Sequence, residues 1–248
     1  MSRFQGGPRR LLLSADVKGY GQEDERSQFD IQRALVRILD EAAEAVGFDR
    51  TAWIRQGAGD GELAILPDGV SEAKVVDDYV AELQAVLERH NHRVRTEHWL
   101  RLRLAVHFGT AHPADNGYAG HGVVLVSRLV DSDPLRQALI AAPESCLAVI
   151  LSEQVYTDTV LQRLTKLSPK EFRQVAVEKK ERQVTAWLRV PGANTHALDL
   201  GATASVPVAP VPESAARPAP AGIVLNGPVH APGSVFGVGT VNNHGVPR

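Results

Sequence analysis

Apolar residues follow two different spacings along this chain. Short apolar runs of strand length occur at 10–16, 101–108 and 147–151. Over residues 25–46, and again from Ser71 onward, apolar residues recur every three or four positions with charged residues between them, which predicts amphipathic helices. Strands and helices therefore alternate along the sequence. This alternation predicts an α/β sandwich in which helices pack on a sheet.

Turn and capping signals bound most of these elements. Gly47 is placed to end the first helix, and Ser71 is placed to cap the second. The apolar stripe of the first helix comprises Phe29, Ile31, Leu35, Ile38, Leu39, Ala42 and Val46. A hairpin is expected where 51–56 pairs with 62–66 around a turn at 57–61. The remaining predicted elements are a polar loop at 113–117, helices at 121–131, 134–141 and 152–164, and a closing hairpin of 172–177 with 183–190.

The composition changes after Pro191. Residues 192–221 are rich in Ala, Pro, Val and Ser and carry few charges, so we expect an extended, disordered linker. Residues 222–248 mix β-branched residues with Gly and Asn, and segments of this kind can stack as identical strands. The sequence thus predicts a folded domain at 9–191, a linker, and a C-terminal peptide that self-associates.

The charge and cysteine content narrow the class of protein. The 248 residues carry a formal net charge of -2, which gives no overall attraction to nucleic acid or to an anionic membrane, and we expect neither as a partner. No apolar run approaches the roughly 20 residues of a membrane-spanning helix, and we find no signal-sequence pattern, so we expect a cytoplasmic protein. The single cysteine, Cys146, lies in an apolar run and is expected to be a buried, inert thiol. Histidines and tryptophans are expected at solvated, core or strand positions.

Two aspartates carry the strongest chemical signal. Asp16 ends an apolar run and Asp60 lies between two glycines. Hard divalent cations prefer carboxylate oxygens, and glycine lets a phosphate approach the backbone, so the pair predicts a two-metal site for phosphoryl transfer. The alternative is structural, because aspartates beside glycine commonly cap turns.

The order of these motifs resembles the catalytic domain of class III nucleotidyl cyclases. The resemblance runs through the Asp-x-x-Gly-aromatic strand end, a helix, the Gly-Asp-Gly hairpin, a second helix, and the segments 101–109 and 120–129. It covers roughly residues 9 to 191. It implies a ferredoxin-like cyclase fold, with helices packed on a mainly antiparallel sheet.

The resemblance also implies roles for individual residues. Asp16 and Asp60 would hold two Mg²⁺ or Mn²⁺ ions, with the backbone carbonyl of Val17 as a further ligand. The triphosphate of a nucleoside triphosphate would lie along the turn at 18–21, at the N-terminus of the helix that follows. The residues implied at that turn and its neighbour are Lys18, Gly19, Tyr20 and Gly59.

Two cations are implied to act on the transferring phosphate. Arg128 matches the arginine that steadies the α-phosphate, and as an alternative it is a surface arginine paired with Asp131. Lys179 occupies the region of the transition-state lysine, with Lys180 as the neighbouring candidate and a solvated hairpin turn as the alternative. The family site forms between two subunits, so a homodimer is implied, in which the aspartates of one chain face Arg128 and Lys179 of the other.

The chain departs from the family at the base and the ribose. The base-contacting positions fall on Gln56 and Gly117. Glutamine both donates and accepts hydrogen bonds, and glycine has no side chain, so these two residues do not select one base of the substrate. The asparagine that orients the ribose falls on Val124, which cannot form a hydrogen bond through its side chain.

The tail carries a resemblance of its own. Residues 236–242 resemble the core of RHIM-type amyloid signalling motifs, with Gly237 in place of the usual glutamine. This implies an effector partner that carries a like motif, and the alternative is a disordered tail. The leading hypothesis is a nucleotidyl cyclase in bacterial signalling or defence. The second hypothesis is an inactive cyclase-like adaptor that dimerises or senses nucleotide and recruits its effector through the tail.

Overall fold

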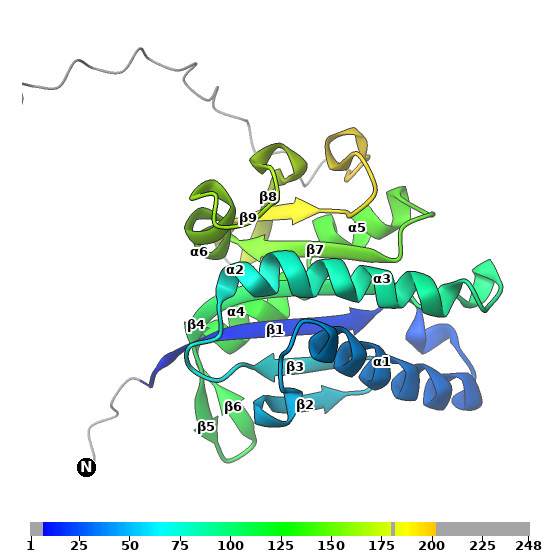
Figure 1. Cartoon of the computed structure of the whole chain (residues 1–248), viewed down its shortest axis with the longest axis horizontal. Coiled ribbons are helices and arrows are strands. Elements are labelled where there is room, and N and C mark those ends of the chain that lie inside the picture. The colour runs from blue at the N-terminus through cyan, green and yellow to red at the C-terminus, as the bar shows by residue number, and fades with distance from the viewer. Residues whose placement is uncertain (1–6, 180–181, 202–248) are drawn as a thin grey trace, which may run out of the picture. The chain divides into compact units, whose positions relative to one another are not determined.

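A seven-stranded sheet forms the centre of the folded part of the chain (Figure 1). The computed structural model describes residues 7–179 and 182–201. Within them the strand order is β2-β3-β1-β4-β7-β9-β8, and all neighbouring strands are antiparallel except β4 and β7. The predicted sandwich with a mainly antiparallel sheet is therefore confirmed.

The elements follow the predicted order closely. The strands are β1 (Arg9–Val17), β2 (Ile54–Ala58), β3 (Gly61–Ile65), β4 (Leu102–Thr110), β5 (His112–Ala114), β6 (Gly117–Ala119), β7 (Leu147–Ser152), β8 (Arg173–Lys179) and β9 (Arg182–Arg189). The helices are α1 (Glu25–Ala45), α2 (Glu72–Lys74), α3 (Val80–Asn91), α4 (His121–Val130), α5 (Asp133–Ala141) and α6 (Glu153–Tyr156). A π-helical segment, Val75–Tyr79, joins α2 to α3.

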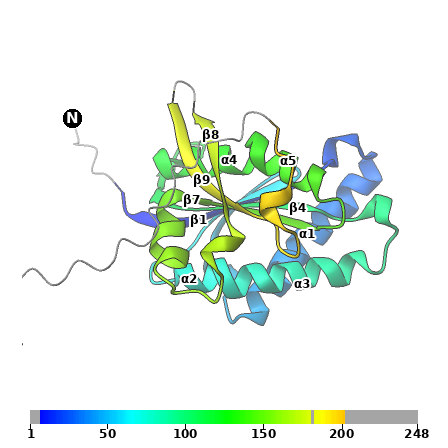
Figure 2. The same ribbon diagram turned by 90° about the horizontal axis from the view of Figure 1, so that it is seen from above.

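Helices cover both faces of the sheet. In Figure 2, α3 runs along one side of the strands, and α4 and α5 run along the other. Each side has its own apolar core: Leu11 and Leu13 belong to the core shared with α1 and α3, and Leu12 belongs to the core shared with α4 and α5. Because successive strand residues point to opposite faces, a strand buried on both faces is apolar at every position.

Local signals set the helix starts. The Asp24 side chain accepts the backbone N–H of Ser27 at the start of α1, and Ser71 caps α2 as predicted by accepting the N–H of Lys74. The predicted stripe of α1 is wrong at one position. Phe29 is 73% exposed, because the buried face of α1 begins beyond it and is centred on Leu35, Ile38 and Leu39.

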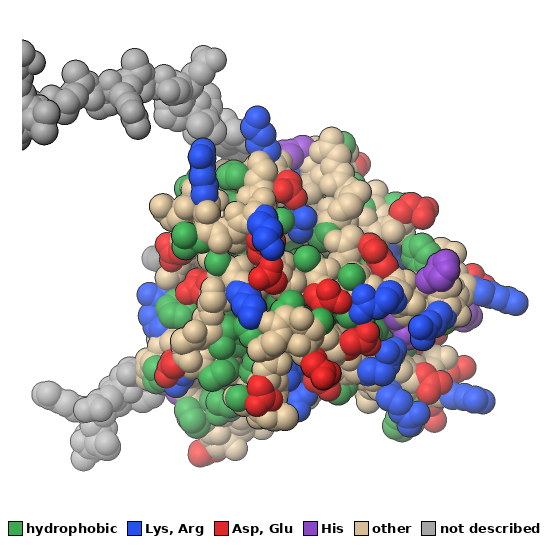
Figure 3. Space-filling model, in the orientation of Figure 1, with side chains coloured by type: hydrophobic (Ala, Val, Ile, Leu, Met, Phe, Trp, Pro, Cys, Tyr) green, Lys and Arg blue, Asp and Glu red, His purple; other side chains and the backbone are tan. Residues whose placement is uncertain are grey.

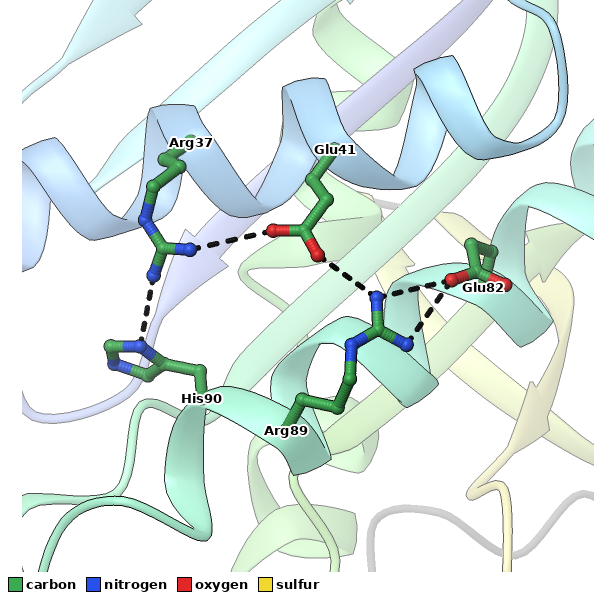
Figure 4. Close-up of polar contacts among 5 residues, drawn as sticks. All are labelled: Arg37, Glu41, Glu82, Arg89 and His90. Carbon is green, nitrogen blue, oxygen red and sulfur yellow. Dashed lines mark hydrogen bonds and ion pairs between the residues drawn. The ribbon is translucent and has the colours of Figure 1, made fainter.

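Polar side chains also join α1 to α3 (Figure 4). Arg37 contacts Glu41 and His90, and Arg89 contacts Glu41 and Glu82. These pairs are exposed to solvent, so their contribution to stability is small and screened by salt. The packing of α1 on α3 therefore depends mainly on the apolar core beneath them.

Three details differ from the predicted elements. The expected polar loop is a short hairpin of β5 and β6, and the turn expected at 57–61 is only Gly59 and Asp60. Residues 192–201, which the composition assigns to the linker, pack on the domain with Thr195 and Leu200 buried. The predicted linker beyond residue 201 and the C-terminal peptide lie outside the described residues. In the described part of the chain, no helix is both long enough and apolar enough to cross a membrane.

Candidate functional site

Asp16 and Asp60 come together at one end of the sheet. Asp16 lies at the end of β1 directly opposite Gly61 of β3, and the backbone N–H of Val17 donates to the carbonyl of Asp60 at 2.9 Å. The two aspartates are therefore neighbours, as the sequence predicted.

The glycines around Asp60 are required by the backbone. Gly59 has φ +57°, in the left-handed region that favours glycine. A Cβ atom at Gly61 would lie 2.7 Å from the backbone oxygen of Ala15. The Gly-Asp-Gly sequence thus allows a tight turn to approach β1, and this approach brings the Asp60 backbone onto Val17.

The structure adds a partner for Asp16 that the sequence did not suggest. Arg103 stands opposite Asp16 on β4, and both its Nε, at 2.7 Å, and one terminal nitrogen donate to Oδ2 of Asp16. Burial raises the pKa of Asp16 although Arg103 acts in the opposite direction, and the carboxylates of Asp60 and Asp131 add to the rise. The sequence alone gave no sign of this contact, because it depends on the register between β1 and β4, which is known only once the strands are paired.

The donor set at this end fits a divalent cation. Both Arg103 contacts are to Oδ2 of Asp16, and the nearby Asp60 charge raises the pKa of Asp16, so a cation would relieve repulsion between the two carboxylates. Among the described residues, no three Asp, Glu, His or Cys side chains gather closely enough to hold a metal. Asp16, Asp60 and the carbonyl of Val17 would hold it, and phosphate oxygens would complete the ligands.

The turn after β1 lies against the Asp60 turn. Gly19 has φ +86°, and the Tyr20 ring lies 3.9 Å from where a Cβ of Gly59 would be. Partial desolvation, then Arg101 and Arg103, lower the pKa of Lys18. The turn leads into a three-residue 3-10 helix and not directly into α1, whose N-terminus is capped by Asp24.

The two predicted base-contacting residues meet. Gly117 begins β6 with φ +95°, and a Cβ at that position would lie 2.8 and 2.9 Å from the amide nitrogen and oxygen of Gln56. Gln56 is 61 positions earlier in the chain and lies on β2. The backbone of Gly117 therefore forms a wall for the Gln56 amide, and a side chain there would displace it.

Arg128 and the closing hairpin share a hollow at the end of α4. It has a volume of about 280 Å³, and Arg128, Asp131 and Glu178 are among its lining residues. Within the described residues Arg128 forms no ion pair, because Asp131 pairs with Arg136 instead. One turn earlier on α4, Val124 is 45% exposed.

The two candidate lysines lie at the tip of this hairpin. Lys179 is the last residue of β8, paired through its backbone with Arg182. Glu178, the residue before it, lines the same hollow as Arg128. Lys180 lies outside the described residues.

A buried ion pair behind the Asp60 turn was also missed. Arg50 is 5% exposed and donates to both carboxylate oxygens of Glu62, at 2.7 and 2.9 Å. It also contacts Asp40 at 3.0 Å and lies over the Trp53 ring. Burial raises the pKa of Glu62. Glu62 is two residues from Asp60, so this network fixes the strand that carries the turn. An isolated arginine in sequence gives no sign of such burial.

Comparison with solved structures identifies the fold. An adenylate/guanylate cyclase/hydrolase from Silicibacter pomeroyi has a TM-score of 0.54 at 22% sequence identity, with 75% of this chain and 100% of that one covered. The guanylyl cyclase Cya2 has a TM-score of 0.51 at 15% identity, with 79% and 100% covered. No family model matches the chain, and no curated protein matches its sequence. A likeness at these identities shows the fold, which is that of adenylate and guanylate cyclase domains.

Proposed function

We propose that this protein converts a nucleoside triphosphate to a 3′,5′-cyclic nucleotide and pyrophosphate. The observation that carries the proposal is the meeting of Asp16 and Asp60 at one end of a cyclase-like sheet. The proximity of Gln56 and Gly117 supports the proposal. The resemblance to the cyclase family had already implied that both positions contact the base.

In the proposed reaction the ribose 3′-hydroxyl gives its proton to water and its oxygen bonds to the α-phosphorus. The bond from that phosphorus to the bridging oxygen breaks, and pyrophosphate leaves with its electron pair. Two Mg²⁺ or Mn²⁺ ions held by Asp16, Asp60 and the Val17 carbonyl would activate the 3′-oxygen and neutralise the triphosphate. Arg128 and Lys179 would stabilise the charge that develops on the α-phosphate. Arg128 suits this task because among the described residues no carboxylate already holds it.

The proposed substrate lies with its triphosphate along Lys18, Gly19 and Tyr20 and beside Gly59. The Gln56 amide contacts the base. An amide offers both a donor and an acceptor, so it fits more than one base edge. The proposal therefore commits to a nucleoside triphosphate and leaves its base to experiment.

The proposed active unit is a homodimer. In it, the aspartates of one chain act with Arg128 and Lys179 of the other, which gives two equivalent sites about a two-fold axis.

The test is incubation of the purified chain with each of ATP, GTP, CTP and UTP and Mn²⁺, with detection of cyclic products by mass spectrometry. Asp60→Ala should abolish turnover and leave thermal unfolding nearly unchanged, because a turn aspartate contributes little packing. Asp68→Ala, which removes an exposed aspartate from another turn, is the matched control and should keep activity. Turnover that survives in Asp60→Ala would disprove the metal assignment.

The second candidate is an adaptor without turnover. Val124, exposed on α4, favours it, because no side-chain group at that position can hold a ribose hydroxyl. In this role the domain dimerises or senses nucleotide, and residues 222–248 recruit an effector by strand stacking. A synthetic peptide of residues 222–248 should then form thioflavin-positive fibrils. A peptide that stays soluble and is not seeded by like motifs would contradict this role for the tail.

A further inference from the structure

A second hollow lies between α1 and the segment that follows α3. Its volume is about 770 Å³, and its lining runs from Lys18 and Gly19, past Asp30 and Ile31 of α1, to residues 93–101. Small-molecule sites in proteins commonly span about 300–1,000 Å³. The lining includes Val17, whose carbonyl is a proposed metal ligand, but neither Asp16 nor Asp60, so the hollow adjoins the proposed metal site without containing its carboxylates.

The hollow offers a flat surface for a ring. Trp99 lines it and is partly exposed, next to the buried Leu100. The aromatic pairs of the described residues involve Phe48, Trp53, Tyr79, Tyr156, Phe172 and Trp187. Trp99 takes part in none of them. A tryptophan face that no other ring of the described chain covers can stack on a planar ligand.

The same lining carries four Lys and Arg side chains, of which two already have polar partners. Arg101 donates to backbone oxygens of Leu139, Ala142 and Ser145, and Arg95 contacts Glu97 at 3.9 Å. Lys18 and Arg93 form no ion pair with any described residue. Figure 3 shows Lys, Arg and His side chains gathered where α3 ends.

His90 also lines the hollow, and burial and the neighbouring arginines lower its pKa. Its Nδ1 accepts a hydrogen bond from Arg37 at 3.1 Å, since a guanidinium can only donate (Figure 4). Burial, then Arg37 and Arg93, lower the pKa of His90. The acids on the lining are Glu23, Asp30 and Glu97, of which Asp30 and Glu23 are on the α1 side. Carboxylates there can accept hydrogen bonds from hydroxyl or amino groups of a ligand.

We propose that this hollow binds a nucleoside monophosphate, with its phosphate at Lys18 and Arg93, its base on Trp99 and its sugar or base donors at Asp30. The bound nucleotide is not a substrate. Because Lys18 and Gly19 line the hollow, the ligand contacts the turn along which the proposed substrate's triphosphate lies. A mononucleotide bound here would therefore regulate the proposed reaction.

The experiment is calorimetric titration of the full chain with AMP, GMP, CMP, UMP and inorganic pyrophosphate, in EDTA so that no metal is present. At least one monophosphate should bind, and its parent nucleoside should bind about tenfold more weakly, because the phosphate contacts are lost. Trp99→Leu and Arg93→Gln should each weaken binding about tenfold, since base stacking and charged hydrogen bonds have that magnitude. Arg33→Gln, an exposed arginine on the outward face of α1, is the matched control and should bind as wild type does.

Asp60→Ala and Gln56→Ala separate this site from the proposed catalytic one, and both should bind the monophosphate as wild type does. Loss of binding in either variant would assign the ligand to the catalytic site and overturn the proposal. Absence of binding by all four monophosphates would also overturn it. So would unchanged binding in both Trp99→Leu and Arg93→Gln. The readout needs no turnover, so failure of the proposed cyclase activity leaves this test intact.

Discussion

The Asp16 carboxylate would have to serve two cations in the proposed reaction. Arg103 occupies Oδ2, and a metal ion would use the remaining lone pairs. Burial and the Asp60 charge raise the pKa of Asp16 above its ordinary 3.8, so protons also compete for the group. The protonation state of this one residue should therefore control metal binding.

Mn²⁺ binding should weaken as the pH falls, and it should begin to do so above the pH expected for an ordinary aspartate. Arg103→Met should move this loss to still higher pH, because Arg103 is the main influence that lowers the pKa of Asp16. Free Mn²⁺ can be measured by electron paramagnetic resonance between about pH 8 and pH 5.

Arg189→Met, which removes a partner of Glu171, is the control and should keep the wild-type pH profile. Mn²⁺ affinity that does not change over this pH range in wild type would rule out Asp16 as a ligand.

At the scale of elements, the β2–β3 hairpin depends on a buried charge pair. Arg50 and Glu62 are 5% and 9% exposed, and the same arginine contacts the fully buried Tyr79, whose pKa is raised by burial. This network ties the hairpin to α1 through Asp40. Removing one partner of a buried pair leaves the other charge desolvated and unpaired.

Arg50→Met should lower the free energy of unfolding by about 3–5 kcal/mol. Arg55→Met is the matched control, because Arg55 contacts the same Asp40 carboxylate at 3.5 Å but is 35% exposed. It should cost less than about 1 kcal/mol. Urea unfolding of both variants measures the difference.

The double variant Arg50→Met with Glu62→Leu should recover much of the loss, since no buried charge then remains. Equal costs for Arg50→Met and Arg55→Met would show that burial of the pair does not matter to the hairpin.

At the scale of the whole molecule, the proposed catalytic groups lie in two separate places on the folded chain. Asp16 lies near the end of β1 and Asp60 in the turn between β2 and β3, while Arg128 and Glu178, the neighbour of Lys179, line a hollow whose lining includes neither aspartate. A two-fold dimer would supply both groups to each site.

Mixing two inactive variants tests this arrangement. Asp60→Ala and Arg128→Ala should each be inactive, and equal amounts unfolded and refolded together should regain about a quarter of wild-type turnover. Half of the dimers would then be mixed, and each mixed dimer would hold one intact site of two. Recovery should be absent when either variant is refolded alone. No recovery in a mixture that forms dimers would place all the groups within one chain.

The sequence by itself determined the elements and the acidic pair. Apolar spacing predicted the strands and helices. The position of Ser71 predicted a helix cap, and the glycines around Asp60 predicted a tight turn. These signals are local, since spacing, capping and turn geometry depend on residues a few positions apart. The pairing of Gln56 with Gly117 was reached only through the family resemblance.

Only the tertiary structure decided which distant residues meet. Arg103 reaches Asp16 through strand register, and Arg50 becomes buried because the hairpin and α1 close over it. The outward position of Phe29 and the hollow at Trp99 likewise depend on how α1 packs on α3. Such contacts follow from register and helix packing, which the chain fixes through all its interactions at once and which no short segment encodes.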